Sequence, residues 1–203
     1  MIDSYQKAFL QMLKEYFNEI IKDYRELLNK AHITFSDVAA ISYIESSFSR
    51  DSKLCTLGNG NPFQIYEGAY LDAVRKSAEK GIDIRDITQS YIAYKTPICK
   101  EYNGKLSIDL DFHRNHLKGA LKMLLSYLWV LWENYNKRLP KINIPEIEKL
   151  LITYFVGIGC TQNIKSIETM DEDVSECLGK EIYPSLYIER YKEGKALVRD
   201  FFT

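Results

Sequence analysis

Residues 34–48 read TFSDVAAISYIESSF, a stretch that predicts a short and almost wholly buried helix. Thr34 and Ser36 carry hydroxyl groups that can cap the first N–H groups of this helix, which is expected to end at 46–49. Glu45 stands close to that end, where burial disfavours the charged form of a carboxyl group and raises its pKa. A proton donor that works near neutral pH needs this property, although a surface glutamate at a helix end would show the same periodicity.

The segments around this helix also carry clear signals. Residues 54–62 hold two glycines, two asparagines and a proline, which permit positive φ or stop a helix, so an exposed loop is expected. Helical spacing resumes over 64–80, and Gly81 is suited to end that helix. Before the central helix, apolar residues over 4–30 recur at helical spacing with charges between them, which predicts one long amphipathic helix.

The second half of the chain is predicted to be mainly helical as well. A wide apolar face favours a long helix at 113–139 that Pro140 closes. Pro145 is placed in the first turn of the next helix, which should end at 157–159, and a final amphipathic helix is expected at 184–202.

Residues 84–112 show the least regular pattern. Asn103 and Gly104 separate two short runs with partial alternation, which is the signal of a two-residue turn in a β-hairpin. The fold class is therefore predicted to be mainly α with a small β-hairpin, and 1–203 to be a single domain.

The composition excludes several classes of protein. The 203 residues are 46% hydrophobic and 27% charged, with few glycines and prolines, which excludes a disordered or collagen-like chain. A formal net charge of −1 provides no basic excess, so no nucleic-acid partner is expected. No apolar run reaches the ~18 residues that a transmembrane segment needs, and the first residues lack the features of a Sec signal.

The four cysteines, Cys55, Cys99, Cys160 and Cys177, have no C-x-x-C spacing, which disfavours a zinc or redox site. Two interpretations stay open: buried thiols, or two disulfides in an oxidising compartment. A bond between Cys55 and Cys99 would tether the loop to the hairpin region.

A run D-x-D-x-H-x-x-H occupies 109–116 and raises the question of a metal site. His113 and His116 could share one helix face and bind zinc, but Asp111 serves equally well as a helix cap. No metal and no other cofactor is predicted.

Three separated segments resemble, in the same order, the goose-type lysozymes and soluble lytic transglycosylases of the lysozyme superfamily. IESSF at 44–48 resembles the catalytic Glu-Ser-x-Phe helix end, and GNGNPFQI at 58–65 is similar to the glycine-rich loop that ends in Gly-Leu-Met-Gln-Ile or Gly-Leu-Met-Gln-Val. ITYFVGIG at 152–159 resembles the Ala-Tyr-Asn-Ala-Gly-x-Gly segment. Two departures occur: Pro-Phe at 62–63 replaces Leu-Met, and Phe155 replaces the asparagine.

A fourth segment, HLKGALKMLLSYL at 116–128, resembles the Ala-Gly-x-x-Tyr-Leu helix that packs beneath the groove. The resemblance places a family-like core at 34–82 and 113–160, an insertion at 84–112 and an additional amphipathic helix at 1–33. It implies a lysozyme-like, transglycosylase-type fold.

The resemblance also implies roles for individual side chains. Glu45 would be the general acid and base that cleaves a glycosidic bond, and Tyr154 would hold its carboxyl group. Substrate-binding roles in the groove are expected for Ser46, Asn59, Gly60, Gln64, Phe63 and Tyr66.

The outcome of the cleavage depends on a second carboxylate. A hydrolase would use one to activate water, and Asp51 and Glu67 are the local candidates. Resemblance to the transglycosylases implies that one glutamate can suffice, because in that family the 6-hydroxyl of muramic acid attacks and leaves a 1,6-anhydro end. The favoured hypothesis is a lytic transglycosylase that acts on the MurNAc-GlcNAc β-1,4 bond.

Two alternatives remain: a hydrolytic lysozyme (muramidase), and a catalytically degenerate module that binds glycans or proteins. Peptidoglycan glycan strands are the expected partner, and the expected location is the cell envelope, periplasmic or secreted. A secretion apparatus and an inhibitor protein are also conceivable partners, but no residue pattern identifies either one.

Overall fold

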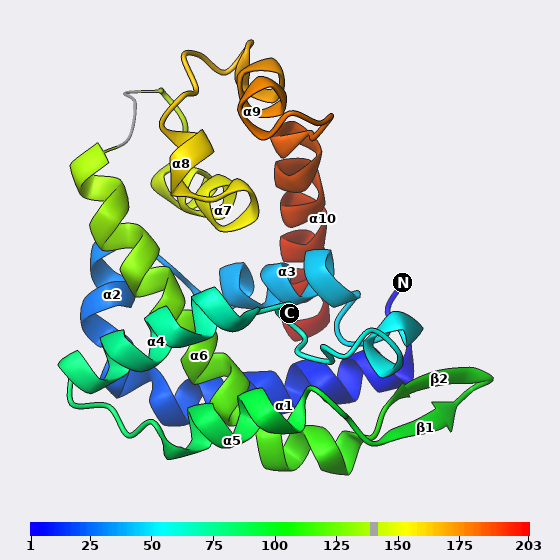
Figure 1. Ribbon diagram of the computed structural model, residues 1–203. Helices are drawn as coiled ribbons and strands as arrows, with labels where there is room; N and C mark the ends of the chain where they lie inside the picture. The colour runs from blue at the N-terminus through cyan, green and yellow to red at the C-terminus, as the bar shows by residue number, and fades with distance from the viewer. Residues whose placement is uncertain (139–141) are drawn as a thin grey trace.

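The protein is mainly helical, with a two-stranded antiparallel hairpin at one side (Figure 1). The computed structural model describes residues 1–138 and 142–203, without the side chains of 135–138. The elements of the described chain are α1 (Ser4–Ile20), η1 (Ile21–Tyr24), α2 (Arg25–Lys30), α3 (Phe35–Ser46), η2 (Ser52–Cys55), α4 (Glu67–Glu79), α5 (Arg85–Ala93), β1 (Cys99–Tyr102), β2 (Lys105–Ile108), α6 (Leu110–Arg138), α7 (Glu146–Val156), α8 (Ile158–Thr161), α9 (Met170–Leu178) and α10 (Pro184–Phe202). The predicted class, mainly α with a small hairpin, is confirmed. Among the described residues, the structure contains no helix with the length and apolarity that crossing a membrane requires.

Helix α6 is the element on which α1, α4 and α5 pack. Its core face is a row of fully buried leucines, Leu117, Leu121, Leu124 and Leu128. Gly119 lets α5 approach closely, because a Cβ atom there would lie 2.2 Å from the carbonyl oxygen of Asp86. α6 begins three residues before the predicted start, where the carboxylate of Asp109 accepts a hydrogen bond from the N–H of Asp111. Asp109, and not Asp111, is therefore the capping residue.

The predicted N-terminal helix is divided into three pieces, α1, η1 and α2. The tighter 3₁₀ geometry of η1 changes the rotation of the apolar face. As a result Tyr24 and Leu27 are fully buried, while Ile21 is 39% exposed. The hydroxyl of Tyr24 donates to the carbonyl oxygen of Lys122 on α6 at 3.0 Å, which fixes this segment to the core.

Helix α3 lies in the middle of the molecule, and α10 packs against it (Figure 1). α3 begins as predicted, since Thr34 and Asp37 form a reciprocal capping box. The buried carboxylate of Asp37 also accepts a hydrogen bond from the hydroxyl of Tyr191 on α10 at 2.6 Å. The close crossing requires Gly194, because a Cβ atom there would lie 2.7 Å from the ring of Tyr43.

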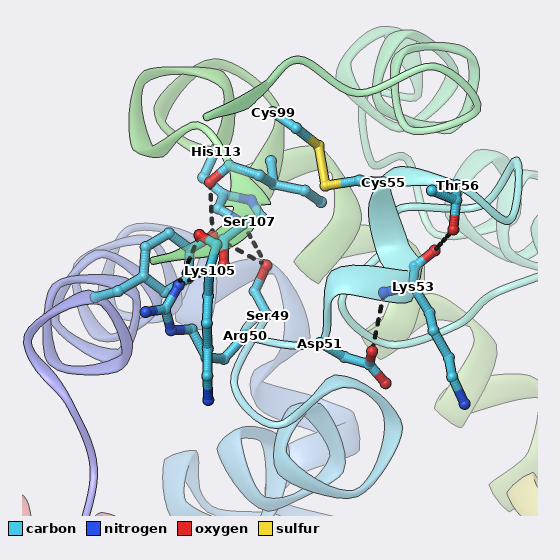
Figure 2. Close-up of a disulfide and its surroundings, with 12 residues drawn as sticks. Ser49, Arg50, Asp51, Lys53, Cys55, Thr56, Cys99, Lys105, Ser107 and His113 are labelled. Carbon is cyan, nitrogen blue, oxygen red and sulfur yellow. Dashed lines mark hydrogen bonds between the residues drawn. A yellow bond between two sulfur atoms is a disulfide. The ribbon is translucent and has the colours of Figure 1, made fainter. Parts of the chain in front are cut away.

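The hairpin forms where the sequence predicts it. Asn103 and Gly104 both have positive φ, as a two-residue hairpin turn requires, and Cys99 pairs with Ile108 at the far end of the ladder. A disulfide between Cys55 and Cys99 joins η2 to β1 (Figure 2). Helix α5, just before the hairpin, is not evident from the sequence pattern, and its buried face is provided by packing on α6.

Helix boundaries elsewhere follow local chemistry. α4 begins three residues after its predicted start, because Gln64 adopts a positive φ of 52°, and Gly81 ends it with a φ of 70°. α7 begins directly after Pro145 and ends at Gly157, which has a φ of 83°. The predicted end of α6 at 139–140 lies outside the described residues.

The C-terminal third is also closed by a disulfide. Cys160 on α8 is bonded to Cys177 on α9. α10 then runs from this region down to α3 (Figure 1). The two disulfides answer the question that the cysteine spacing left open.

Candidate active site

The chain leaves α3 through a sharp turn immediately after Glu45. Ser47, Phe48 and Ser49 all have positive φ, between 52° and 63°, a region that residues with side chains rarely adopt. The N–H groups of Ser47 and Phe48 donate back to carbonyl oxygens of the last helical turn, which satisfies the helix end. Glu45 is thereby held in the last turn of the helix, next to the point where the chain changes direction.

Ser46 holds this turn from the inside. Its hydroxyl donates to the carbonyl oxygen of Pro62 at 2.8 Å and accepts from the N–H of Ser49 at 3.0 Å. It is only 2% exposed, so it has almost no surface with which to contact a ligand. The structure therefore gives Ser46 a supporting position between α3 and the glycine-rich loop, and not the direct substrate contact that was expected.

Glu45 is half-buried, and its carboxylate accepts a hydrogen bond from the hydroxyl of Tyr187 on α10 at 2.6 Å. Burial raises the pKa of Glu45 to about 7, and the hydrogen bond from Tyr187 and the positive charge of Arg190 oppose that rise. At neutral pH the carboxyl group is thus divided between its protonated and ionised forms. A group in this state can both donate and accept a proton.

Tyr154 lies in the same cavity as Glu45 but does not hold its carboxyl group. The hydroxyl of Tyr154 donates to the carbonyl oxygen of Phe63 instead. The expected hydrogen bond from Tyr154 to Glu45 is therefore wrong, because the hydroxyl of Tyr154 is engaged by the carbonyl oxygen of Phe63. Tyr154 ties α7 to the loop and forms a wall beside Glu45.

Tyr187 makes the contact with Glu45 that the resemblance implies for Tyr154. Its ring stacks on Phe155 of α7, with ring centres 4.4 Å apart and planes at 20°, which restrains the direction of its hydroxyl. Phe155 is the residue that departs from the family pattern, and here it supports the partner of Glu45. Sequence reasoning missed Tyr187 and Arg190, although Tyr187 and Tyr191 lie four residues apart and therefore on one face of the predicted helix.

Two cavities meet at Glu45. The first has a volume of about 510 Å³, and Tyr66, Tyr127 and Tyr154 contribute to its walls. The second, about 450 Å³, lies towards α10. Both include Glu45 and Phe155 among their lining residues, so the carboxyl group stands where the two adjoining hollows meet. This arrangement suits an extended ligand that passes the acid on both sides.

The glycine-rich loop is held by contacts within itself and with the core. Asn59 donates to the carbonyl oxygen of Ile65 at 3.2 Å and accepts from the N–H of Asn61 at 3.0 Å. Gly60 is buried, and its N–H donates to the carbonyl oxygen of Tyr94 at 2.7 Å. Phe63 is 0% exposed. The loop is therefore less exposed than expected.

These positions correct two expected ligand contacts. Gly60 is required because a Cβ atom would lie 2.8 Å from the side chain of Pro97, so its lack of a side chain serves packing. Phe63 belongs to the core and cannot line the groove. Both follow from the loop folding onto the hairpin region and the core, a tertiary contact that the local sequence does not report.

Gln64 and Tyr66 do line the first cavity. The amide of Gln64 donates to the carbonyl oxygens of Asn59 and Asn61 at 3.1 and 2.8 Å, which fixes the side chain across the loop. The hydroxyl of Tyr66 donates to the amide oxygen of Gln64 at 3.2 Å, and Tyr66 is 63% exposed. Tyr66 offers an aromatic face to a ligand in the cavity.

The two candidate second carboxylates occupy different places. Asp51 lines the first cavity together with Glu45, and it accepts a hydrogen bond from the N–H of Lys53 at 2.9 Å, which caps η2 (Figure 2). Glu67 is an exposed residue in the first turn of α4 and is not part of either cavity wall. Of the two, only Asp51 is placed to act with Glu45.

Behind the turn, a buried polar network supports the site. Both ring nitrogens of His113 are hydrogen-bonded, one to the hydroxyl of Ser49 at 2.5 Å (Figure 2) and one to that of Tyr94 at 2.8 Å. Burial lowers the pKa of His113 to about 3, so the imidazole is neutral. His113 thus joins the hydroxyl of Ser49 in the turn to Tyr94 in the core. No group of three metal-ligating side chains occurs within the part of the chain that the structure describes.

No protein-family model, curated protein or solved structure matches the chain. The lysozyme-like fold therefore stays a prediction. What the site can do is inferred from its residues and their geometry.

Proposed function

We propose that the protein cleaves peptidoglycan glycan strands at the MurNAc-GlcNAc β-1,4 bond, with Glu45 as general acid and base. The observation that carries the proposal is a carboxyl group whose pKa is raised to about 7 at the meeting point of two cavities. General acid and base catalysis is most efficient when the pKa lies near the working pH. The aromatic wall of the first cavity suits the apolar faces of sugar rings.

In the proposed reaction, protonated Glu45 donates its proton to the glycosidic oxygen while the bond to the anomeric carbon of muramic acid breaks. Positive charge develops at that carbon, and the carboxylate of Glu45 is now ionised. The 6-hydroxyl of the same muramic acid then attacks the anomeric carbon and gives its proton to Glu45. The product carries a 1,6-anhydro end, and the acid is restored for the next cycle.

The placement of the other carboxylates favours this transglycosylase outcome. Glu67 lies away from the cavity walls, and Asp51 is engaged as the cap of η2. A hydrolytic lysozyme is the second candidate, because Asp51 does line the cavity and could activate water there. Reaction in water labelled with heavy oxygen separates the two: a transglycosylase yields anhydro ends without label, and a lysozyme yields labelled reducing ends.

The two disulfides support a location in an oxidising compartment, in line with the envelope location proposed for the substrate. Pro-Phe at 62–63 and Phe155 depart from the motifs that the chain resembles. A glycan-binding module without activity is therefore the alternative that an experiment must exclude. Incubation with purified peptidoglycan, followed by mass spectrometry of the soluble fragments, tests the proposal. Binding without any soluble fragment would contradict it.

A further inference from the structure

The second cavity next to Glu45 has features that a bare glycan strand does not need. It has a volume of about 450 Å³ and is formed mainly by the N-terminal part of α10 and the residues that precede it. Leu186 is 52% exposed and Tyr183 is 46% exposed, so its apolar wall is open to a ligand. The cavity is distinct from the first one, yet both share Glu45 and Phe155.

Two opposite charges line this cavity. Arg190 is exposed, and its guanidinium lies 5.8 Å from the centre of the Tyr43 ring, while none of the described carboxylates forms an ion pair with it. Glu181 is also exposed and accepts a hydrogen bond from the hydroxyl of Tyr183 at 3.1 Å. No described cation forms an ion pair with Glu181. A positive and a negative group thus line one hollow without a salt bridge to the described chain, although the charge of Arg190 also acts on Glu45.

Arg190 is held on the face of α10 that meets α3. It follows Tyr187 by three residues, which places both side chains on the same side of the helix. Tyr187 contacts Glu45, so Arg190 stands beside the point of cleavage. A ligand group that reaches Arg190 is therefore attached close to the bond that is cut.

We propose that this cavity binds the peptide that substitutes muramic acid, with Arg190 receiving a peptide carboxylate and Glu181 a peptide ammonium group. The inference rests on the proposed function. Muramic acid carries its peptide through the lactyl group, next to the bond that Glu45 would cleave. Peptides of this kind hold free carboxylates, and those with a diamino acid also hold a free amine. Without the peptide, a glycan strand carries the lactyl carboxylate of muramic acid as its only charge, so it offers no ammonium group to Glu181.

The test compares two substrates: glycan strands with their peptides, and the same strands stripped of peptides by an amidase. The wild type is expected to show a higher kcat/KM on the peptide-bearing strands. Glu181→Gln is expected to lower the ratio of the two kcat/KM values by about fivefold, the scale of an exposed ion pair, because only the peptide brings an ammonium group. Arg190→Gln is expected to lower the ratio less, because the stripped strands keep the lactyl carboxylate of muramic acid. An effect of Arg190 on the acidity of Glu45 acts on both substrates alike and cancels in the ratio.

Arg85→Gln is the matched control, since Arg85 is exposed on α5 and lines neither cavity. Its ratio should equal that of the wild type. Equal wild-type rates on the two substrates, or an unchanged ratio in a Glu181→Gln variant that unfolds at the wild-type temperature, would overturn the inference and leave the proposed function standing. Cleavage of neither substrate by the wild type would overturn the proposed function, and the inference with it.

Discussion

Tyr187→Phe is expected to move the alkaline limb of the pH–rate profile to higher pH. The hydroxyl of Tyr187 donates to the carboxylate of Glu45 at 2.6 Å and thereby favours the ionised form. The general acid must be protonated, so the rate falls as the pH rises through the pKa of Glu45, which is about 7. Without the hydroxyl, the ionised form loses stabilisation and the pKa rises.

The size of the shift follows from the strength of the bond. A hydrogen bond to a charged group contributes about 1.5–3 kcal/mol, and the half-burial of Glu45 places this one at the lower end. One pKa unit corresponds to about 1.4 kcal/mol, so the limb should move by about one unit. The measurement is kcat/KM for the release of soluble fragments from peptidoglycan across the pH range.

Tyr191→Phe provides a matched control. Tyr191 lies one turn further along α10 and also donates to a buried carboxylate at 2.6 Å, but that carboxylate belongs to Asp37. The control should lower the thermal stability without moving the limb. An unmoved limb in a folded Tyr187→Phe variant, or a shift to lower pH, would refute the reasoning.

Three further predictions concern stability. At about pH 8, Glu45→Gln should have a free energy of unfolding about 1–3 kcal/mol higher than the wild type in denaturant unfolding, because the pKa of Glu45 is raised in the folded protein, which therefore loses stability as Glu45 ionises. The gain should vanish below the ordinary pKa of 4.5. Cys55→Ser with Cys99→Ser should cost about 4 kcal/mol in denaturant unfolding, against about 3 kcal/mol for the other disulfide, since the bonds span 44 and 17 residues. Gly119→Ala should cost about 2 kcal/mol by the same assay, because the new Cβ would meet the carbonyl oxygen of Asp86 at 2.2 Å and force α5 outward.

Local chemistry made much of the fold predictable. The capping box at Thr34, the stops at Gly81 and Gly157 and the turn at Asn103 and Gly104 depend on neighbouring residues, and all lie where the sequence places them. The break at η1 and the short helix α5 depend on which face meets α6. A single sequence does not contain that information in its local pattern.

The candidate site shows the same difference between features set by neighbouring residues and features set by packing. Glu45 could be proposed from the sequence because the helix end and the loop around it resemble known motifs over short stretches of the chain. Its partner Tyr187 lies 142 residues away and reaches it only through the packing of α10 on α3. Phe63 was assigned to the groove because it stands in the loop motif, but the loop folds inward and buries it. Contacts between distant segments decided both outcomes.

The most direct test of the central claim compares the wild type with Glu45→Gln on purified peptidoglycan, with soluble products identified by mass spectrometry and binding measured by sedimentation with the insoluble wall. We expect anhydro-muropeptides from the wild type alone and equal binding by both proteins, because glutamine keeps the shape of the side chain and cannot donate the proton. Equal fragment release by the two proteins, or no release by either, would contradict the role of Glu45.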